Sequence, residues 1–227
     1  KMKTTTAIAA ALLLALSLAQ AWDFTREYDT IPVYFDSVQC QVPWTTGYNY
    51  INPTFADIDG DNDFDLIMGS DWSRVSFFKN NGDSVIVDLQ LITDSLVVWP
   101  NITPEPQTPC KPITCDIDND GDKDLFVGAY ISFPTSEGRL LFYKNTGSAN
   151  NHVFVLEDEI FQNVQVLSNP IPYFIDIDSD NDYDLFIGFS GPWTAWAGKM
   201  SYYRNDGTPD SASMTLITDY FMNIDLG

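Results

Sequence analysis

After residue 22 the chain alternates short apolar stretches with polar, turn-forming stretches. The apolar stretches are rich in β-branched and aromatic residues, and Gly, Asn, Asp and Pro separate them. This is the pattern of short β-strands joined by tight turns. No stretch after residue 22 repeats its apolar residues with the period of an amphipathic helix. The pattern therefore predicts an all-β protein.

One segment of this pattern occurs three times, at residues 52–69, 111–128 and 171–188. Each copy has Pro at its second position, five aspartates at alternate positions and an Asp-Leu-x-x-Gly ending. The first aspartates of the three copies are 59 and then 60 residues apart, and an aromatic-x-Asn-x-Gly turn follows each copy. Such constant spacing indicates one structural unit that is repeated along the chain.

Each repeat predicts about four short strands, which in the middle repeat should lie near residues 112–116, 124–129, 139–145 and 152–156. A four-stranded unit that recurs at this spacing is typical of a β-propeller blade, and a β-sandwich is the alternative. The predicted organisation is an export signal, a partial blade or linker, and three repeats of which the last is truncated before a next blade, at residues 1–21, 22–50, 51–110, 111–170 and 171–227.

The charge balance narrows the classes of partner. The chain has 32 acidic and 11 basic residues, and its net charge is −21. Nucleic-acid binding and contact with anionic lipids both need clustered Lys and Arg, so neither is expected. The acidic residues are 27 Asp and only 5 Glu. Because general solubility would use both, this excess of Asp points to turns, caps or metal loops.

Each aspartate loop carries carboxylates at its positions 1, 3, 5, 7 and 9. Alternate residues of an extended segment point the same way, so the carboxylates at positions 1, 3 and 5 can converge on one point. Position 6 is Asn or Gly, which tolerates the positive φ that a wrapped loop needs. Position 2 is always Ile, and we expect it to point into the core. Dense oxygen ligands in a flexible loop favour Ca²⁺ over Mg²⁺.

The loops are not EF-hands, because loop position 12 holds Met68, Val127 and Ile187 where an EF-hand needs Glu. The motif Pro-x-x-x-Asp-x-Asp-x-Asp-x-x-x-Asp-Leu-x-x-Gly over residues 50–227 resembles FG-GAP/VCBS repeats, the blades of integrin-alpha-like calcium-binding β-propellers. This resemblance implies three Ca²⁺ sites, each with side-chain ligands at positions 1, 3, 5 and 9 and a backbone carbonyl at position 7. The implied sets are Asp57, Asp59, Asp61, Asp63 and Asp65; Asp116, Asp118, Asp120, Asp122 and Asp124; and Asp176, Asp178, Asp180, Asp182 and Asp184.

The number of repeats departs from the family pattern. Propellers have about four to eight blades, and three repeats are visible here. Two explanations stay open: the sequence is the N-terminal fragment of a longer propeller, which we favour, or several copies associate as a homo-oligomer to close a ring. An open stack of three blades would expose edge strands and apolar faces.

The N-terminus predicts export. A short basic start precedes an uncharged apolar run from Ala7 to Leu18, and Ala19-Gln20-Ala21 fits a signal-peptide cleavage site. The mature chain is therefore expected to be secreted or at the cell surface, without a membrane span; a membrane anchor is the alternative. Disulfides are then permitted. Cys110 could pair with Cys115, or Cys40 could pair with either of them.

The sequence favours a binding protein over an enzyme. The chain has one histidine, His152, which is expected at the surface, and no Gly-x-Ser-x-Gly nucleophile motif. The loop between the second and third predicted strands carries aromatic residues in every repeat, which could bind an extracellular protein or a carbohydrate, or could pack between blades. These candidates are Trp72, Tyr130, Phe133, Trp193 and Trp196.

We therefore expect a non-catalytic, calcium-binding adhesion scaffold. Two alternatives remain: an accessory propeller domain of a secreted carbohydrate-active enzyme, and a self-assembling extracellular structural protein. Metal loops determine the architecture of a blade and do not identify what its surface binds.

Overall fold

The computed structural model describes residues 34–35, 38–39, 48, 50–71, 74–99, 109–131, 137–190 and 198–223. The chain forms two compact units, Lys1–Trp44 and Thr45–Gly227. In the first unit, β1 (Tyr34–Phe35) pairs antiparallel with β2 (Val38–Gln39). The predicted export signal, residues 1–21, lies outside the described residues. Within the described ranges, no helix combines the length and the hydropathy of a membrane span.

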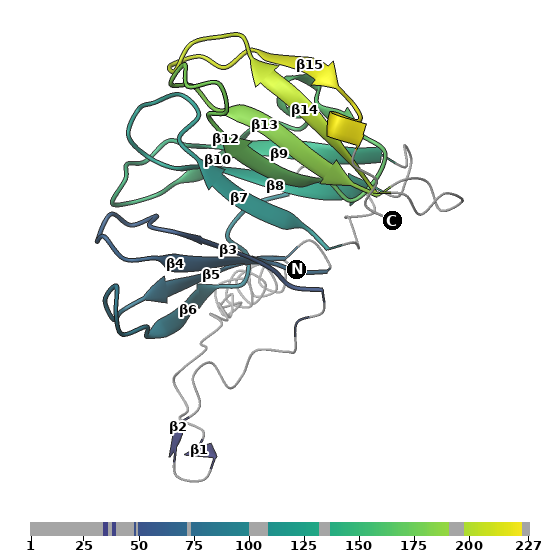
Figure 1. Ribbon diagram of the computed structural model, residues 1–227. Helices are drawn as coiled ribbons and strands as arrows, with labels where there is room; N and C mark the ends of the chain where they lie inside the picture. The colour runs from purple at the N-terminus through teal and green to yellow at the C-terminus, as the bar shows by residue number, and fades with distance from the viewer. Residues whose placement is uncertain are drawn as a thin grey trace, which may run out of the picture. The chain divides into compact units, whose positions relative to one another are not determined.

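The second unit contains three sheets, each built from four consecutive antiparallel strands (Figure 1). The first sheet comprises β3 (Asn52–Ala56), β4 (Asp65–Gly69), β5 (Val75–Asn80) and β6 (Leu89–Thr93). The second comprises β7 (Lys111–Cys115), β8 (Asp124–Ile131), β9 (Glu137–Asn145) and β10 (Phe154–Asp158). The third comprises β12 (Ile171–Ile175), β13 (Asp184–Phe189), β14 (Lys199–Asn205) and β15 (Met214–Thr218).

One short strand and two 3₁₀ helices accompany the second and third sheets. The strand β11 (Gln165–Val166) adds to β9, and the 3₁₀ helices η1 (Phe161–Asn163) and η2 (Phe221–Asn223) follow β10 and β15. The all-β prediction is confirmed, and the strands of the middle repeat lie within two residues of their predicted ends. The sheets are consistent with propeller blades, but in the described part of the chain they do not close into a ring.

The repeated aromatic-x-Asn-x-Gly motif forms the turn between the third and fourth strands of each sheet. In the second sheet, the side-chain oxygen of Asn145 accepts hydrogen bonds from the backbone N–H groups of Gly147 at 3.1 Å and Val153 at 2.8 Å. Asn80 and Asn205 make the equivalent pairs of bonds. The Asn therefore closes both ends of the turn, as Asn does in Asx turns, and this explains why it recurs.

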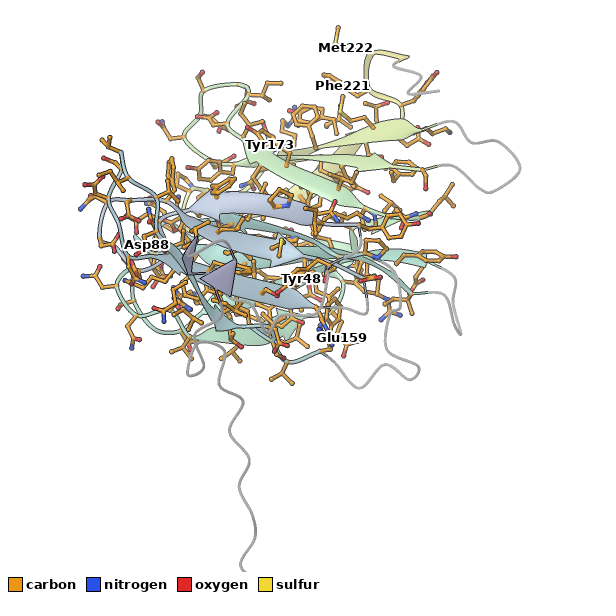
Figure 2. The ribbon with its side chains drawn as sticks, turned by 90° about the horizontal axis from the view of Figure 1, so that it is seen from below. Tyr48, Asp88, Glu159, Tyr173, Phe221 and Met222 are labelled. Carbon is orange, nitrogen blue, oxygen red and sulfur yellow. The ribbon has the colours of Figure 1, made fainter. Side chains whose placement is uncertain are left out.

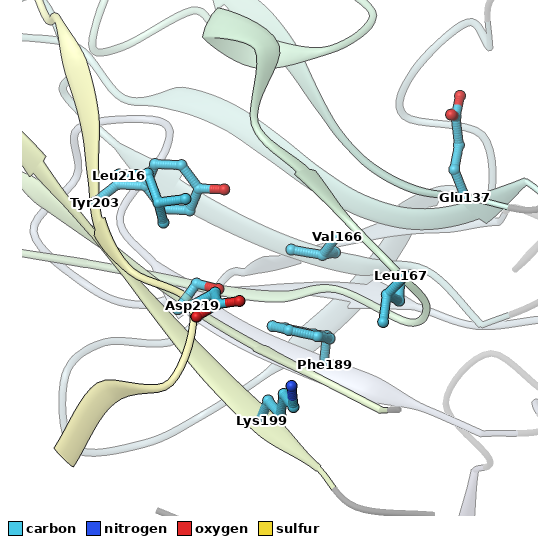
Figure 3. A pocket seen from close by; sticks show the side chains of 9 residues that line it. Glu137, Val166, Leu167, Phe189, Lys199, Tyr203, Leu216 and Asp219 are labelled. Carbon is cyan, nitrogen blue, oxygen red and sulfur yellow. The ribbon is translucent and has the colours of Figure 1, made fainter. Parts of the chain in front are cut away.

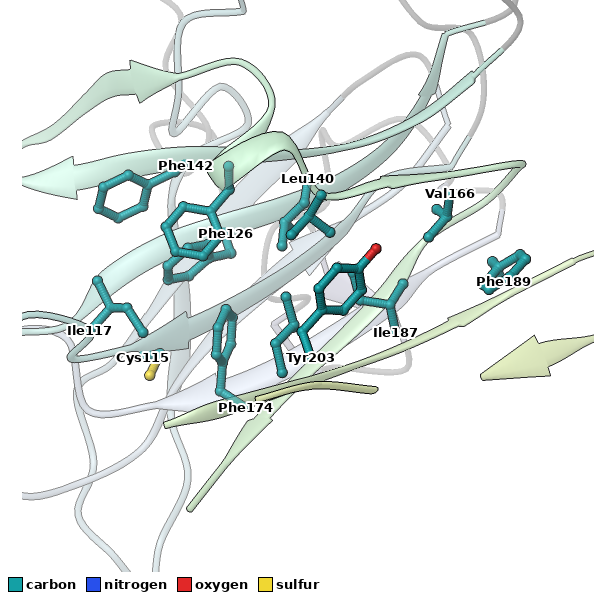
Figure 4. Close-up of a cluster of buried hydrophobic side chains, with 13 residues drawn as sticks. Cys115, Ile117, Phe126, Leu140, Phe142, Val166, Phe174, Ile187, Phe189 and Tyr203 are labelled. Atoms are coloured by element: carbon teal, nitrogen blue, oxygen red, sulfur yellow. The ribbon is translucent and has the colours of Figure 1, made fainter. Parts of the chain in front are cut away.

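Two cores hold the three sheets together, one on each side of the second sheet. The first contains Ile67 and Phe77 from the first sheet and Leu125, Val127 and Leu141 from the second. The other joins the second and third sheets and is shown in Figure 4; its members include Phe126, Phe142, Phe174, Leu185 and Ile187. Because strand side chains alternate between faces, the second sheet is apolar on both faces and is covered on both.

The inner strands of neighbouring sheets approach so closely that glycine is needed there. A Cβ placed on Gly128 of β8 would lie 2.2 Å from the carbonyl oxygen of Pro170, which leads into the third sheet. A Cβ on the equivalent Gly69 would lie 2.3 Å from the carbonyl oxygen of Cys110. At Gly188 of the third sheet the nearest atom would be 3.9 Å away. The third repeat therefore keeps this glycine, although no neighbouring sheet approaches it among the described residues.

The two described cysteines are free, so of the pairings that the sequence left open, Cys110–Cys115 is not formed. Cys110 directly precedes the extended strand β7 and Cys115 ends it, so a rise of about 3.3 Å per residue separates them far beyond the reach of a disulfide. Cys110 belongs to the first core and Cys115 to the second. Burial raises the pKa of these thiols to about 11 and about 12 respectively, so both behave as small apolar core residues. Cys40 lies outside the described residues.

Candidate metal-binding loops

The aspartate loops connect the first and second strands of each sheet, so all three occupy equivalent places in the fold. In each loop the structure brings together the carboxylates of positions 1, 3 and 5, with one oxygen of each within 4.8 Å of the others. The three clusters are Asp57, Asp59 and Asp61; Asp116, Asp118 and Asp120; and Asp176, Asp178 and Asp180. The convergence expected from the alternate spacing is therefore present in every loop.

The loop conformation arises from bonds within the loop itself. The backbone N–H groups of Gly60 and Asn62 donate to the two carboxylate oxygens of Asp57, at 2.7 and 3.0 Å. Ser179 and Asn181 donate to Asp176 in the same way, at 2.7 and 3.1 Å. The position-1 carboxylate thus folds the loop around its own oxygens.

Positive φ angles occur at position 6, as predicted, and also at position 4. At position 6, Asn62, Gly121 and Asn181 have φ angles of 70°, 93° and 72°. At position 4 the residues are Gly60, Asn119 and Ser179, with φ angles of 74°, 55° and 66°. Position 4 was missed from the sequence, although Gly, Asn and Ser are turn residues.

The aspartate at position 9 of each loop has a structural role that was not predicted from the sequence. Asp65, Asp124 and Asp184 are almost fully buried, with exposed fractions of 0%, 0% and 1%. One oxygen of Asp124 accepts the backbone N–H of Asn145 at 2.8 Å, and the other accepts that of Ile117 at 3.4 Å. Asp65 and Asp184 make the same bonds. This carboxylate therefore ties the loop to the third strand. In the third loop, Oδ2 of Asp184 also accepts a bond from the Tyr202 hydroxyl at 3.4 Å.

Burial raises the pKa of the position-9 carboxyl in the first two loops, to about 6 for Asp65 and about 7 for Asp124. Burial, together with the neighbouring position-5 aspartate, also raises the pKa of position 7, to about 6 for Asp182. Both effects disfavour the ionised carboxylate. A loop with five aspartates therefore concentrates more negative charge than its own surroundings neutralise.

Several carboxylate oxygens in these loops have no hydrogen-bond partner although they are buried. Within the described part of the chain they are the Oδ1 atoms of Asp59, Asp63, Asp116, Asp118, Asp122 and Asp182. Buried polar atoms are nearly always paired in native proteins. A cluster of unpaired anionic oxygens matches the ligand set of a hard divalent cation such as Ca²⁺. The residues present therefore fit the implied metal.

A basic residue follows the third-strand aromatic in every repeat, and its behaviour differs between loops. Lys79 forms an ion pair with Asp59 and lies 3.4 Å from Asp61, and Lys144 forms an ion pair with Asp118 and lies 3.9 Å from Asp120. Arg204 instead bonds to Asp206 at 2.6 Å. The first two loops thus hold an internal counterion, a feature absent from our sequence prediction.

Each of the first two loops is covered by the hairpin of the next sheet. The Nδ1–H group of His152 in the second sheet donates a hydrogen bond to the carbonyl oxygen of Ile58, at 3.2 Å. Its ring also stacks on Phe154 and meets Phe77 edge-on. The expectation of a surface histidine is therefore wrong. Burial lowers the pKa of His152, which suits a neutral packing residue.

The second loop is covered in a similar way, by the hairpin of the third sheet. Asn119 donates to the carboxylate of Asp210 at 3.0 Å. A small cavity of about 230 Å³ lies between the second and third loops, and Asp116, Asp176 and Tyr183 are among the residues that line it. No described hairpin covers the third loop, and its position-2 residue Ile177 is 48% exposed. Ile58 and Ile117 are buried as expected, so the prediction fails only where a neighbouring sheet is missing.

Most of the aromatic residues predicted to form a ligand surface lie outside the described residues. Tyr130 lies in β8 and is partly exposed. The other four candidates, Trp72, Phe133, Trp193 and Trp196, lie outside the described residues. A cavity of about 490 Å³ lies between the second and third sheets, where Figure 3 shows Glu137, Lys199 and Asp219 among its lining side chains.

Comparison with known proteins gives no assignment: no protein-family model, no curated protein and no solved structure matches this chain.

Proposed function

We propose that this chain is an exported, calcium-stabilised β-propeller segment of the FG-GAP/VCBS type that serves as a non-catalytic adhesion or interaction scaffold. The observation that carries the calcium part is the convergence of the position-1, -3 and -5 carboxylates in every loop, beside buried carboxylate oxygens that have no hydrogen-bond partner among the described residues. The side chains at positions 1, 3 and 5 of each loop would hold the ion. Bound Ca²⁺ would supply the positive charge that these carboxylates lack.

Electrostatics support a structural role for the ion. Two carboxylates about 5 Å apart repel by roughly 0.8 kcal/mol even in water, and each loop contains several such pairs. At free Ca²⁺ about 100-fold above Kd, each occupied site would stabilise the fold by about 2.7 kcal/mol. Three sites together would then contribute a large share of the roughly 5–15 kcal/mol typical of a domain. Calcium would act as part of the fold.

The scaffold part of the proposal rests on where the reactive residues lie. His152, the single histidine of the sequence, packs between two aromatic rings. Cys110 and Cys115 are core residues with raised pKa values. The acidic clusters are accounted for by the metal. These placements favour an interaction module, in the extracellular space or at the cell surface, with a protein or carbohydrate as partner.

Thermal unfolding of the full chain in excess EDTA and in millimolar Ca²⁺ tests the proposal. We expect Ca²⁺ to raise Tm by about 10 °C or more, because three sites add their binding free energies to a domain of this size. Mg²⁺ is the matched control and should raise Tm far less, since it demands a more rigid octahedral site. An unchanged Tm in Ca²⁺ would mean that the loops are solvated acidic turns.

A further inference from the structure

The second and third sheets contact each other through a specific aromatic arrangement. Phe126 and Phe142 of the second sheet stack with ring centroids 4.9 Å apart, and Phe161 of η1 meets both edge-on or tilted, at 4.9 and 5.3 Å. Phe174 of β12, in the third sheet, completes the cluster, with its ring centroid 4.5 Å from that of Phe126. All four belong to the core between these two sheets.

The same three-ring arrangement occurs on the far side of the third sheet. Phe186 and Tyr202 stack at 4.8 Å, and Phe221 of η2 meets them at 5.0 and 5.6 Å. These residues are the repeat counterparts of Phe126, Phe142 and Phe161. Around them Tyr173 and Ile175 are 59% and 40% exposed. In Figure 2, Phe221 and Met222 lie beyond the third sheet, on the side away from the first.

We call this surface, formed by Tyr173, Ile175, Phe186, Tyr202 and Phe221, the aromatic face. Among the described residues, nothing fills the place that Phe174 fills on the second sheet. At Gly188, at the edge of this face, the atoms nearest to an added Cβ belong to Ile171 of the same sheet, and no described backbone of another sheet approaches. The aromatic face therefore has the residues of a sheet-to-sheet contact, and no described residue of this chain occupies it.

The first sheet presents the matching residue. Phe55 of β3 stands at the repeat position of Phe174, and it is 59% exposed. Alternation along β3 places Phe55 on the side opposite Ala56, which belongs to the core with the second sheet. Ile51, on the same side as Phe55, is 55% exposed. We call this surface, formed by Ile51 and Phe55, the Phe55 face.

Within this chain, the residue at the repeat position of Phe174 differs according to the side chains that face it. At the contact between the first and second sheets, the position of Phe174 is occupied by Thr114, and the opposing positions hold Ile67 and Phe77. A phenylalanine therefore occurs at this position where a three-ring cluster faces it, as between the second and third sheets. Phe55 is the other phenylalanine at this position, and the aromatic face is the other three-ring cluster.

We propose that the Phe55 face of one copy of this chain docks on the aromatic face of a second copy, head to tail, in the geometry of the contact between its own second and third sheets. The occupant is a second copy because this chain itself carries both complementary faces. The contact joins two different surfaces, so it is heterologous and leads to a closed ring or an open filament. This inference deepens the self-assembling alternative for the proposed function and uses no metal ligand.

Sedimentation velocity of the full chain in Ca²⁺, over a wide range of concentrations, tests the proposal. We expect concentration-dependent association. Phe55→Thr, which installs the residue natural at the equivalent place in the second sheet, should weaken it about 30-fold, as removal of a central aromatic anchor does. Tyr173→Asp should weaken it similarly from the other face. Val85→Thr, at an 85% exposed turn, is the matched control and should change nothing.

Mixing the two variants distinguishes a head-to-tail contact from a symmetric one. Each variant keeps one intact face, so an equimolar mixture should form a heterodimer that neither variant forms alone. A monomer at all concentrations, or association unaffected by either variant, would overturn the proposal. Loss of association without recovery in the mixture would also overturn it, because that result indicates a symmetric interface. If Phe55→Thr altered unfolding of a chain that stays monomeric, Phe55 would belong to an intramolecular contact.

Each association experiment is paired with its own Tm measurement in Ca²⁺ and EDTA. Failure of the calcium proposal appears as a Tm that does not respond to the ion. Failure of the docking proposal appears as a folded, calcium-responsive chain that stays monomeric. The two failures are therefore distinguishable.

Discussion

The second and third acidic loops share all five aspartates but differ in their surroundings. Around the second loop, Lys144 pairs with Asp118, and Asp210 of the next sheet bonds to Asn119. Around the third, Arg204 is turned to Asp206, and no described hairpin follows. Both loops share the bonds from position 6 to the position-1 carboxylate and the two backbone bonds of the position-9 aspartate. The bond from position 4 to the position-1 carboxylate is made by Ser179 in the third loop, whereas Asp116 Oδ1 in the second has no partner among the described residues. Loop conformation is thus a local property, whereas the charge and cover around a loop depend on the neighbouring sheet.

The largest expected effect tests the backbone bonds of the position-9 aspartate, which the second and third loops share. Asp124→Ala removes a carboxylate that accepts two backbone N–H bonds and leaves both donors buried, which should cost about 2–5 kcal/mol. Asp184→Ala should cost at least as much, because Asp184 makes the two equivalent backbone bonds and also accepts a bond from the Tyr202 hydroxyl. Urea unfolding in EDTA measures both without the metal. A much smaller loss for Asp184→Ala would mean that the covering sheet, rather than the loop, sets the contribution.

The second-largest effect concerns His152, the residue of the second sheet that covers the first loop. His152→Ala removes a ring that packs against Phe77 and Phe154, together with the bond to Ile58, and should cost about 1–3 kcal/mol. Alanine is natural at the equivalent position 212 in the third sheet. Val153→Ala, at a 47% exposed neighbour, is the control and should stay within about 0.5 kcal/mol. If the two variants unfolded alike, His152 would be a surface residue after all.

The smallest effect tests the internal counterions. Lys144→Met removes a positive charge beside Asp118, so Ca²⁺ no longer competes with it and should bind about 3- to 10-fold more tightly. Arg204→Met should leave the calcium titration nearly unchanged, because Arg204 is turned to Asp206. Isothermal titration at two salt concentrations measures both. Weaker binding by Lys144→Met would show instead that the lysine helps to hold the loop in shape.

Much of the fold was predictable because its determinants are local. The strands follow from short apolar stretches between turn residues. The side-chain oxygen of the Asn that closes each hairpin accepts bonds from residues two and eight positions away. The converging carboxylates at positions 1, 3 and 5 follow from their spacing and from the positive φ angles at positions 4 and 6 of the loop. Even the overlooked positive φ at position 4 was marked by Gly, Asn or Ser.

The rest depended on contacts between distant residues. The bond from His152 to Ile58 spans 94 positions, and nothing near His152 in sequence distinguishes a packed ring from an exposed one. The separation of Cys110 from Cys115 required knowing that the residues between them form one extended strand. Lys79 and Lys144 reach loops about 20 or more positions earlier because the third strand runs beside the second.

The sequence by itself determined the repeated four-stranded unit, the acidic loops and their internal geometry, because each of these is set within a few residues by alternation, turn chemistry and side-chain-to-backbone bonds. Only the tertiary structure decided which copies of the repeat are covered. Ile117 is buried and Ile177 is exposed, and Phe174 is enclosed and Phe55 is not, although the repeats place these residues identically. Burial depends on the sheet that stacks against a face, and a residue's own repeat carries no information about that neighbour.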